Sequence, residues 1–188
     1  MNKKYFSRSA SRAWFFGLSC LVVSATSQAQ LPADVQEKVN AYKTQLQKWA
    51  SHPVIVNAVK NANATGSVLP DMSNSRWLDV PESDPRVTQL SSNDAGALMS
   101  EWEADPNISK LYLRDAEGNM VAAGRNKPLL WNNKTKPPFQ NAIKGEGVWT
   151  ADEIKPDPAS QIPGVHVSAP IMDGGKAIGV LHTSVVAK

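Results

Sequence analysis

The sequence predicts an α+β fold, with a central antiparallel sheet of about five strands and a long N-terminal helix packed on one face. Two observations predict it. Near the N-terminus, apolar residues recur at spacings of four and three, which indicates one face of a helix. From Ile108 to Val186, short stretches of alternating apolar and polar residues are separated by turn residues, as in antiparallel strands.

Residues 1–29 are predicted to be a signal peptide. Its basic start holds Lys3, Lys4, Arg8 and Arg12. An apolar segment from Ala13 to Ala25 follows, and the small residues Ser27 and Ala29 suit a signal peptidase, so cleavage is expected after Ala29. Residues 30–188 then form a single domain, helical and irregular over 30–107 and carrying the sheet and pocket over 108–188. We expect a soluble protein that is periplasmic or secreted.

Removal of this segment changes the charge of the protein. The full chain has 20 basic and 17 acidic residues, and four of the basic ones but none of the acidic ones lie before residue 30. The remainder is therefore close to neutral, which argues against a nucleic-acid partner, because such binding depends on neutralising phosphates. The single cysteine, Cys20, also leaves, so stability must come from an apolar core and not from disulfides.

The first helix is expected from about Ala33 to Ser51. Its apolar seam consists of Val35, Val39, Tyr42, Leu46 and Trp49. Pro53 fits the first turn of a second helix, from Val54 to Ala62. The seam suits either packing on the domain's own sheet, which we favour, or a homodimer contact.

The next part of the chain is expected to be irregular from Asn63 to Gln89. Within it, Trp77 and Leu78 are predicted to cover the core. A further helix begins at a cap formed by Ser92 or Asn93. Its apolar side carries Ala95, Leu98, Met99 and Trp102.

The strands of the sheet follow. We expect them at Ser109–Arg114, Met120–Gly124, Gly147–Ala151, Val165–Ile171 and Ala177–Val186. Their connections are a tight turn, a loop that leads into a short helix, and a polar loop: Asp115–Asn119, Lys127–Pro137 with the helix from Pro138 to Gly145, and Asp152–Pro163. In the first strand, Leu111 and Leu113 point to one face and Lys110, Tyr112 and Arg114 to the other.

The last two strands form a hairpin whose register depends on its turn. A two-residue turn at Gly174 and Gly175 pairs Asp173 with Lys176. One face then holds Val165, Val167, Ala169, Ile171, Ile178, Val180 and His182, and the other holds His166, Ser168 and Thr183. A five-residue loop would instead set His166 opposite His182. We favour the two-residue turn because it gathers the β-branched residues on one face.

The sequence contains no recognisable catalytic or metal-binding motif. The histidines His52, His166 and His182 lack metal-ligand spacing. Neither Ser168 nor Ser184 lies in a nucleophile-elbow context. We therefore predict that the protein is not an enzyme and carries no cofactor or metal.

Aromatic residues offer the clearest functional pattern. Trp131 lies in a loop where no periodicity requires it, and Trp149 lies in a strand that leads into an acidic loop. They either form the wall of a small-molecule pocket or simply cover one face of the sheet. Polar groups for such a pocket would come from Tyr112, Arg114, Arg125, Asp152, His166 and Ser168.

Two segments, Leu111–Ala122 and Val167–Leu181, resemble the corresponding parts of single Cache domains, also called PDC sensor domains, which are extracytoplasmic relatives of the PAS fold. The resemblance implies a ligand pocket on the sheet face opposite the long helix. It assigns that pocket to Tyr112, Arg125, Trp131, Phe139, Trp149, Asp152 and His166. The Arg-x-Trp-Tyr box of amino-acid-binding Cache domains is absent, because five residues separate Arg125 from Trp131 and Asn132 follows.

The function expected from this resemblance is that of an exported sensor-type protein that binds a small metabolite. Most Cache domains are joined to a membrane-spanning signalling helix, whereas this sequence ends at Lys188 after the last strand. We therefore expect a membrane-bound signalling protein as partner. The alternative is a periplasmic interaction module without a ligand, which dimerises through the seam of the first helix.

Overall fold

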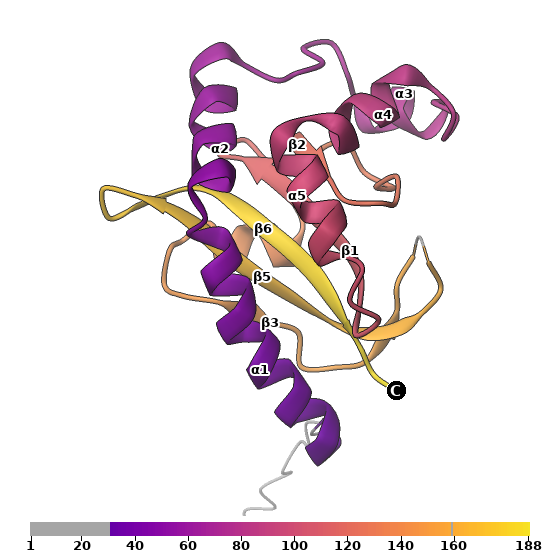
Figure 1. Ribbon diagram of the computed structural model, residues 1–188, viewed down its shortest axis with the longest axis vertical. Coiled ribbons are helices and arrows are strands. Elements are labelled where there is room, and N and C mark those ends of the chain that lie inside the picture. The colour runs from indigo at the N-terminus through magenta and orange to yellow at the C-terminus, as the bar shows by residue number, and fades with distance from the viewer. Residues whose placement is uncertain (1–30, 159) are drawn as a thin grey trace, which may run out of the picture.

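A computed structural model describes residues 31–158 and 160–188, so the predicted signal peptide lies outside the described part. The predicted α+β class is confirmed (Figure 1). The helices are α1 (Ala33–Ala50), α2 (Pro53–Thr65), α3 (Asn74–Leu78), α4 (Pro85–Ser92), α5 (Asp94–Trp102) and α6 (Pro137–Ala142). The strands are β1 (Ile108–Asp115), β2 (Met120–Ala123), β3 (Trp149–Thr150), β4 (Lys155–Pro156), β5 (Pro163–Asp173) and β6 (Lys176–Val186).

The strands form one antiparallel sheet in the order β2-β1-β6-β5-β3. The short strand β4, which the sequence did not predict, also pairs with β5, through Lys155 and Gly164. The long strands β5 and β6 therefore lie inside the sheet. The shortest strands, β3 and β4, both pair with β5 and form one edge of the sheet.

The long helix α1 lies across β5 and β6 on one face of the sheet (Figure 1). Its seam residues Val35, Val39, Leu46 and Trp49 are buried in the main core. The remaining seam residue, Tyr42, is half-buried and donates a hydrogen bond from its hydroxyl to Asp105. The favoured interpretation of the seam is thus confirmed. Because the domain's own sheet already covers this face, it is not free to form the dimer contact.

The region from 63 to 89, predicted to be irregular, contains two short helices. Ser73 caps α3, and Asp84 caps α4, each accepting a hydrogen bond from a backbone N–H two or three residues later. Trp77 is completely buried, as predicted, but Leu78 is 60% exposed. The prediction for Leu78 was wrong because neighbouring residues of a helical turn face different directions.

Side chains of β1 alternate as predicted. Leu111 and Leu113 join the core under α1 and α2, whereas Lys110, Tyr112 and Arg114 line a cavity on the opposite face. Helix α5 begins at Asn93, whose side chain accepts a hydrogen bond from the backbone N–H of Gly96. The helix ends before Asn107, which leads directly into β1.

The hairpin has the predicted two-residue turn, with Asp173 opposite Lys176. However, the register shifts by one residue between Ile171 and Met172, which places Ala169 opposite Leu181 and His166 opposite Ser184. Beyond such a bulge every side chain of one strand changes face. Ile178 packs against the core with the valines of β5, as predicted, but the predicted placement of Val180 and His182 on that face was wrong. The alternative pairing of the two histidines was also wrong.

Gly179 shows what favours this register. It lies opposite Ile171 and next to Asp115, beneath α2. A Cβ atom there would lie 2.7 Å from Val59 Cγ1 and would also collide with the carbonyl oxygen of Arg114. Only glycine fits at this point, which keeps Leu181 in the core and turns His182 towards the cavity.

Over residues 31–158 and 160–188, none of the helices combines the length and the apolar character that crossing a bilayer requires.

Candidate ligand-binding cavity

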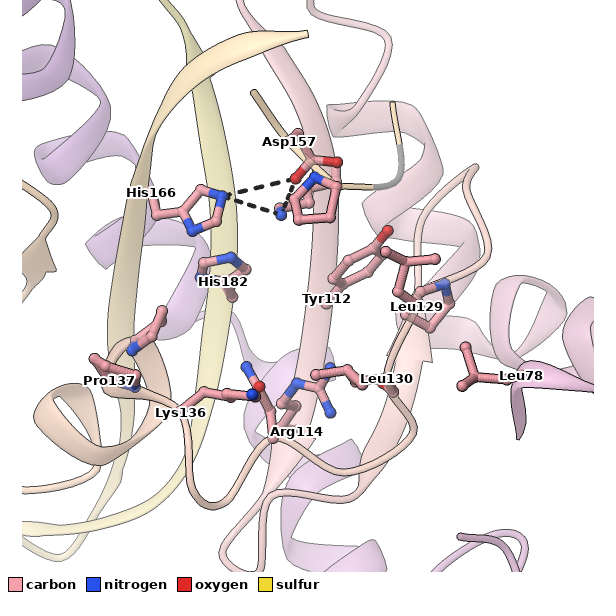
Figure 2. A pocket seen from close by; sticks show the side chains of 15 residues that line it. Leu78, Tyr112, Arg114, Leu129, Leu130, Lys136, Pro137, Asp157, His166 and His182 are labelled. Atoms are coloured by element: carbon pink, nitrogen blue, oxygen red, sulfur yellow. Dashed lines mark hydrogen bonds and ion pairs between the residues drawn. The ribbon is translucent and has the colours of Figure 1, made fainter. Parts of the chain in front are cut away.

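A cavity of about 440 Å³ lies on the sheet face opposite α1. Strands β1, β5 and β6 supply its floor, from which side chains project into the space shown in Figure 2. These floor residues are Lys110, Tyr112, Arg114, His166 and His182. The volume falls in the range of pockets that hold small molecules, roughly 300–1,000 Å³.

The loop between β2 and α6, together with the first residues of α6, forms the opposite wall. Its lining residues are mostly aliphatic or proline: Pro128, Leu129, Leu130, Asn133, Lys136, Pro137 and Pro138. Leu78, Asp157 and Pro158 complete the lining. The cavity is therefore polar along its floor and largely apolar along its wall.

Arg114 joins the floor to this wall. Its Nη1 donates to the carbonyl oxygens of Gly118 and Trp131, at 3.0 and 2.9 Å, and its Nη2 donates to that of Leu130, at 3.0 Å. The planar guanidinium suits this task because its donors are held in a fixed arrangement. One side chain thus holds the loop over the cavity.

In the described part of the chain, the carboxylate of Asp115 acts on the charge of Arg114 but lies beyond ion-pair distance. Arg114 is 3% exposed, forms no ion pair there, and its Nε has no hydrogen-bond partner. Burial lowers the pKa of Arg114 to about 10, which still leaves the guanidinium charged at neutral pH. A buried cation without a counter-ion is costly. Arg114 therefore makes the floor of the cavity favourable for an anion.

Tyr112 adds a second unused donor. Its hydroxyl is buried and has no partner in the described residues, although the ring lines the cavity (Figure 2). Burial, followed by the charges of Asp157 and Glu103, raises the pKa of Tyr112 well above its ordinary value. The phenol is therefore neutral and able to donate a hydrogen bond.

Lys110, Asp157 and His166 form a charged cluster at the side of the cavity opposite Arg114 (Figure 2). Lys110 donates a hydrogen bond to Asp157 Oδ2, and His166 Nε2 lies 3.7 Å from the same oxygen and 3.4 Å from Lys110 Nζ. Burial by itself would raise the pKa of Asp157, but hydrogen bonds from His166 and Lys110 hold it well below its ordinary value. Burial lowers the pKa of Lys110, and the contact with Asp157 opposes that effect.

His182 lies between this cluster and the rest of the floor. Its Nδ1 is 2.7 Å from Ser168 Oγ, and its ring packs edge-on against His166 with centroids 5.1 Å apart. Burial, followed by the charge of Lys110, lowers the pKa of His182 well below its ordinary value. The imidazole is therefore neutral. Among the described residues that line the cavity, Lys110, Arg114 and Lys136 are the cations and Asp157 is the one carboxylate.

Three of the residues predicted from the sequence line this cavity, namely Tyr112, Arg114 and His166. Ser168 lies behind His182 and is completely buried. Phe139 and Trp149 pack around Val180 beside the cavity.

The other predicted residues lie elsewhere in the structure. Trp131 is buried against Trp77, with ring centroids 5.3 Å apart, so only its backbone meets Arg114. Arg125 lies on the surface, where its Nε donates to the carbonyl oxygen of Ser100. Asp152 is exposed in the loop after β3.

Sequence reasoning did not assign Lys110, Asp157 or His182 to the cavity. Lys110 could have been found, because it alternates with Tyr112 and Arg114 on one strand. His182 was placed on the wrong face by the undetected bulge. Asp157 pairs with Lys110 across 47 positions of sequence, and no local pattern reveals such a contact.

No family model matches this sequence, and no curated protein matches it either. Solved structures do resemble it. The sensory domain of the Campylobacter jejuni chemoreceptor Tlp3 with isoleucine bound shows 16% identity, covers 82% of this chain and 64% of its own, and has a TM-score of 0.42. The sensor domain of the Vibrio cholerae histidine kinase DctB shows 16% identity, with 81% and 57% covered and a TM-score of 0.42.

A third similar structure is the ligand-binding domain of the Pseudomonas fluorescens chemoreceptor CtaA in complex with L-serine, at 13% identity, with 81% and 61% covered and a TM-score of 0.40. All three are sensor or ligand-binding domains. This chain spans less than two thirds of the length of each. Likeness at this level says nothing about what this chain binds.

Proposed function

We propose that this protein is an exported sensor domain of the single Cache type that binds a small anionic metabolite in the cavity over β1, β5 and β6. One observation carries the proposal. Arg114 is buried on the cavity floor beside Tyr112 and forms no ion pair among the described residues, and neither its Nε nor the Tyr112 hydroxyl has a hydrogen-bond partner there.

A bound anion would complete these contacts. Buried donors that lack acceptors cost free energy, about 1–3 kcal/mol for a neutral group and more for a charged one. A carboxylate beside Arg114 would supply negative charge, and a second acceptor group of the same ligand beside Tyr112 would receive its hydroxyl hydrogen. Hydrogen bonds between a guanidinium and a carboxylate are among the strongest available to proteins.

The apolar wall narrows the choice of ligand. Leu129 and Leu130 face the floor from the loop, and Leu78 contributes at the rim (Figure 2). A compact acid with an aliphatic or aromatic part would use both surfaces. A highly polar anion such as a polyphosphate would leave the apolar wall without a partner.

The cellular setting is part of the proposal. The predicted signal peptide over 1–29 supports export, and the resemblance to Cache domains supports a membrane-bound signalling protein as partner. Binding rather than catalysis fits the geometry. Ser168 Oγ does contact His182, as a nucleophile contacts its base, but Ser168 is completely buried and does not line the cavity.

Thermal denaturation with a panel of small carboxylates tests ligand binding. A ligand that binds only the folded state stabilises it by about 2.7 kcal/mol at a hundredfold excess over its Kd, which raises Tm. Arg114→Met should abolish the rise. Arg125→Met, which removes a surface arginine outside the cavity, is the matched control and should keep it. The proposal fails if no acid raises Tm, or if both variants lose the response equally.

Export is tested separately on the full sequence. Expressed in a bacterium, the protein should be recovered from the periplasmic fraction or the medium, with a mass that corresponds to a chain beginning at Gln30. Recovery of the uncleaved chain from the cytoplasm would contradict export while leaving ligand binding open to its own test.

A further inference from the structure

The single carboxylate among the described residues that line the cavity is already engaged by the protein. Asp157 and Lys110 form an ion pair in which both side chains are nearly inaccessible, at 1% and 8% exposure. His166 approaches the same oxygen of Asp157. The ammonium group of Lys110 thus lies where a cationic group of a ligand would otherwise contact Asp157.

The second oxygen of Asp157 is engaged as well. Its Oδ1 accepts a hydrogen bond from the backbone N–H of Ser160 at 3.0 Å and contacts the Ser160 hydroxyl at 3.3 Å. The backbone N–H of Asp157 donates to Ile162, and its carbonyl oxygen accepts from Gln161. Both the carboxylate and the backbone of Asp157 are therefore held by hydrogen bonds.

We infer that Lys110 determines the class of ligand, because its ammonium group occupies the position at Asp157 that the ammonium group of an amino acid would need. This inference rests on the proposed function and makes it narrower. The cavity accepts carboxylates without an amino group and rejects the corresponding zwitterionic amino acids.

The electrostatics of the cavity give the physical reason. An incoming ammonium group would lose its hydration and would meet the charges of Lys110, Arg114 and Lys136. It would find no free carboxylate, and a desolvated charge without a partner is strongly unfavourable. A carboxylate at Arg114 has no such difficulty. Specificity then comes from an unfavourable contact with the wrong ligand rather than an extra contact with the right one.

A competing arrangement is an exchange of partners. An amino acid could place its carboxylate on Lys110 and its ammonium group on Asp157, which would replace the internal pair by two external ones. That arrangement predicts that amino acids bind as tightly as their deaminated partners or more tightly. Binding measurements therefore distinguish it from the exclusion of amino acids by Lys110.

Matched pairs of acids provide the first test, on the unaltered protein. Titration calorimetry at pH 7 is performed with propanoate and L-alanine, 4-methylpentanoate and L-leucine, and 3-phenylpropanoate and L-phenylalanine. The members of each pair differ only in the amino group. We expect at least one acid to bind, and its amino partner to bind at least tenfold more weakly. Equal or tighter binding of the amino acid overturns the inference and leaves the proposed function standing. Absence of binding by all six compounds overturns both.

Lys110→Met provides the second test. Methionine retains the bulk of the side chain but removes the ammonium group from Asp157 Oδ2, so the affinity for the amino acid of the responding pair should rise at least tenfold relative to that for its deaminated partner. Lys110→Met/Asp157→Asn, which removes both charges together, should again discriminate against the amino acid. If the ratio of the affinities for the two acids is the same in Lys110→Met as in the wild-type protein, Lys110 does not determine the class of ligand.

Loss of folding does not obstruct these experiments. If Lys110→Met alone does not fold, the inference is tested on the wild-type protein and the charge-balanced double variant. For each, the affinity for the deaminated acid is compared with that for the amino acid. The double variant should then bind the deaminated acid and reject the amino acid. Binding of the amino acid to the double variant would show that Asp157 has no part in the discrimination.

Discussion

The two faces of the sheet are built from the same strands and differ completely in chemistry. On the face under α1 and α2, Leu111, Leu113 and Leu181 are fully buried in an apolar core. On the other face, the alternate residues Tyr112 and Arg114 line a cavity and leave buried donors unused. The apolar core therefore lies on one face, and the proposed binding site lies on the other.

Buried polar groups also have different partners on the two faces of the sheet. On the helix side, Thr183 is buried but donates its hydroxyl hydrogen to the carbonyl oxygen of Lys110 at 2.7 Å. On the cavity side, Lys110 and Asp157 form an ion pair, whereas Arg114 forms none within the described ranges. Substitutions on the two faces should therefore differ in size and in their dependence on charge.

The largest loss of stability is expected on the cavity side. Asp157→Asn leaves Lys110 buried without its partner, which should lower the free energy of unfolding by about 3–5 kcal/mol. Denaturant unfolding measures the loss. Adding Lys110→Met should restore much of it, because neither charge then remains. A change below about 0.5 kcal/mol for the single variant, as at an ordinary surface site, would mean that the pair does not hold the loop.

Leu111→Ala probes the apolar face and should cost about 2–5 kcal/mol, because it leaves a void in a close-packed core. No charge compensates for this loss. The affinity for the cavity ligand should be unchanged in calorimetry, since Leu111 points away from the cavity. A large loss of affinity in the folded variant would contradict the separation of the two faces.

Gly179→Ala tests the register that sets the faces. The added methyl group would lie 2.7 Å from Val59 Cγ1 and against the backbone of Arg114, so we expect a loss of about 1–3 kcal/mol from overpacking. Val59→Ala should recover part of the loss if the side chain is the obstacle. Gly174 has open space around it but a positive φ of 55°, so Gly174→Asn is the control and should be nearly neutral.

His182 gives the cavity face a dependence on pH that the apolar face lacks. Its pKa is lowered in the folded protein, so below about pH 6.5 the unfolded chain binds a proton that the folded chain does not. Stability from this group is therefore fully present above that pH and falls as pH decreases, by up to about 1.4 kcal/mol per pH unit. Unfolding of His182→Asn between pH 7 and pH 5 should show a smaller slope. An equal slope would assign the dependence to other groups.

The smallest effect is expected for Tyr112→Phe. Removing a buried hydroxyl without a partner should leave the free energy of unfolding unchanged or raise it by up to about 1 kcal/mol without ligand. The same variant should bind the anionic ligand more weakly, which calorimetry would show. Lower stability without ligand would indicate that the hydroxyl has a structural partner.

Much of the fold could be predicted from local patterns. The helical seam from Val35 to Trp49, the proline at the start of α2, and the alternation along β1 all persist in the structure. The short helices α3 and α4 were missed, although Ser73 and the Asp84–Pro85 pair carry ordinary capping chemistry. Their apolar content was too small to show periodicity.

The candidate site was less accessible to sequence reasoning. Tyr112, Arg114 and His166 were found because strand alternation is local, whereas Asp157 joins the cavity only through a contact between distant segments. Trp131 was assigned to the pocket for its aromatic character. The structure instead uses its ring to fill a core with Trp77.

The sequence alone determined most of the elements: the helices α1, α2, α5 and α6, the turn between β5 and β6, and the residues of β1 that share a face. These follow from the 3.6-residue and two-residue periods of the backbone and from the limited conformations of proline and glycine. Only the tertiary structure decided the register of β6 and the pairing of Lys110 with Asp157. A single bulge reverses the faces of a strand, and an ion pair between remote segments depends on where the loops come to rest.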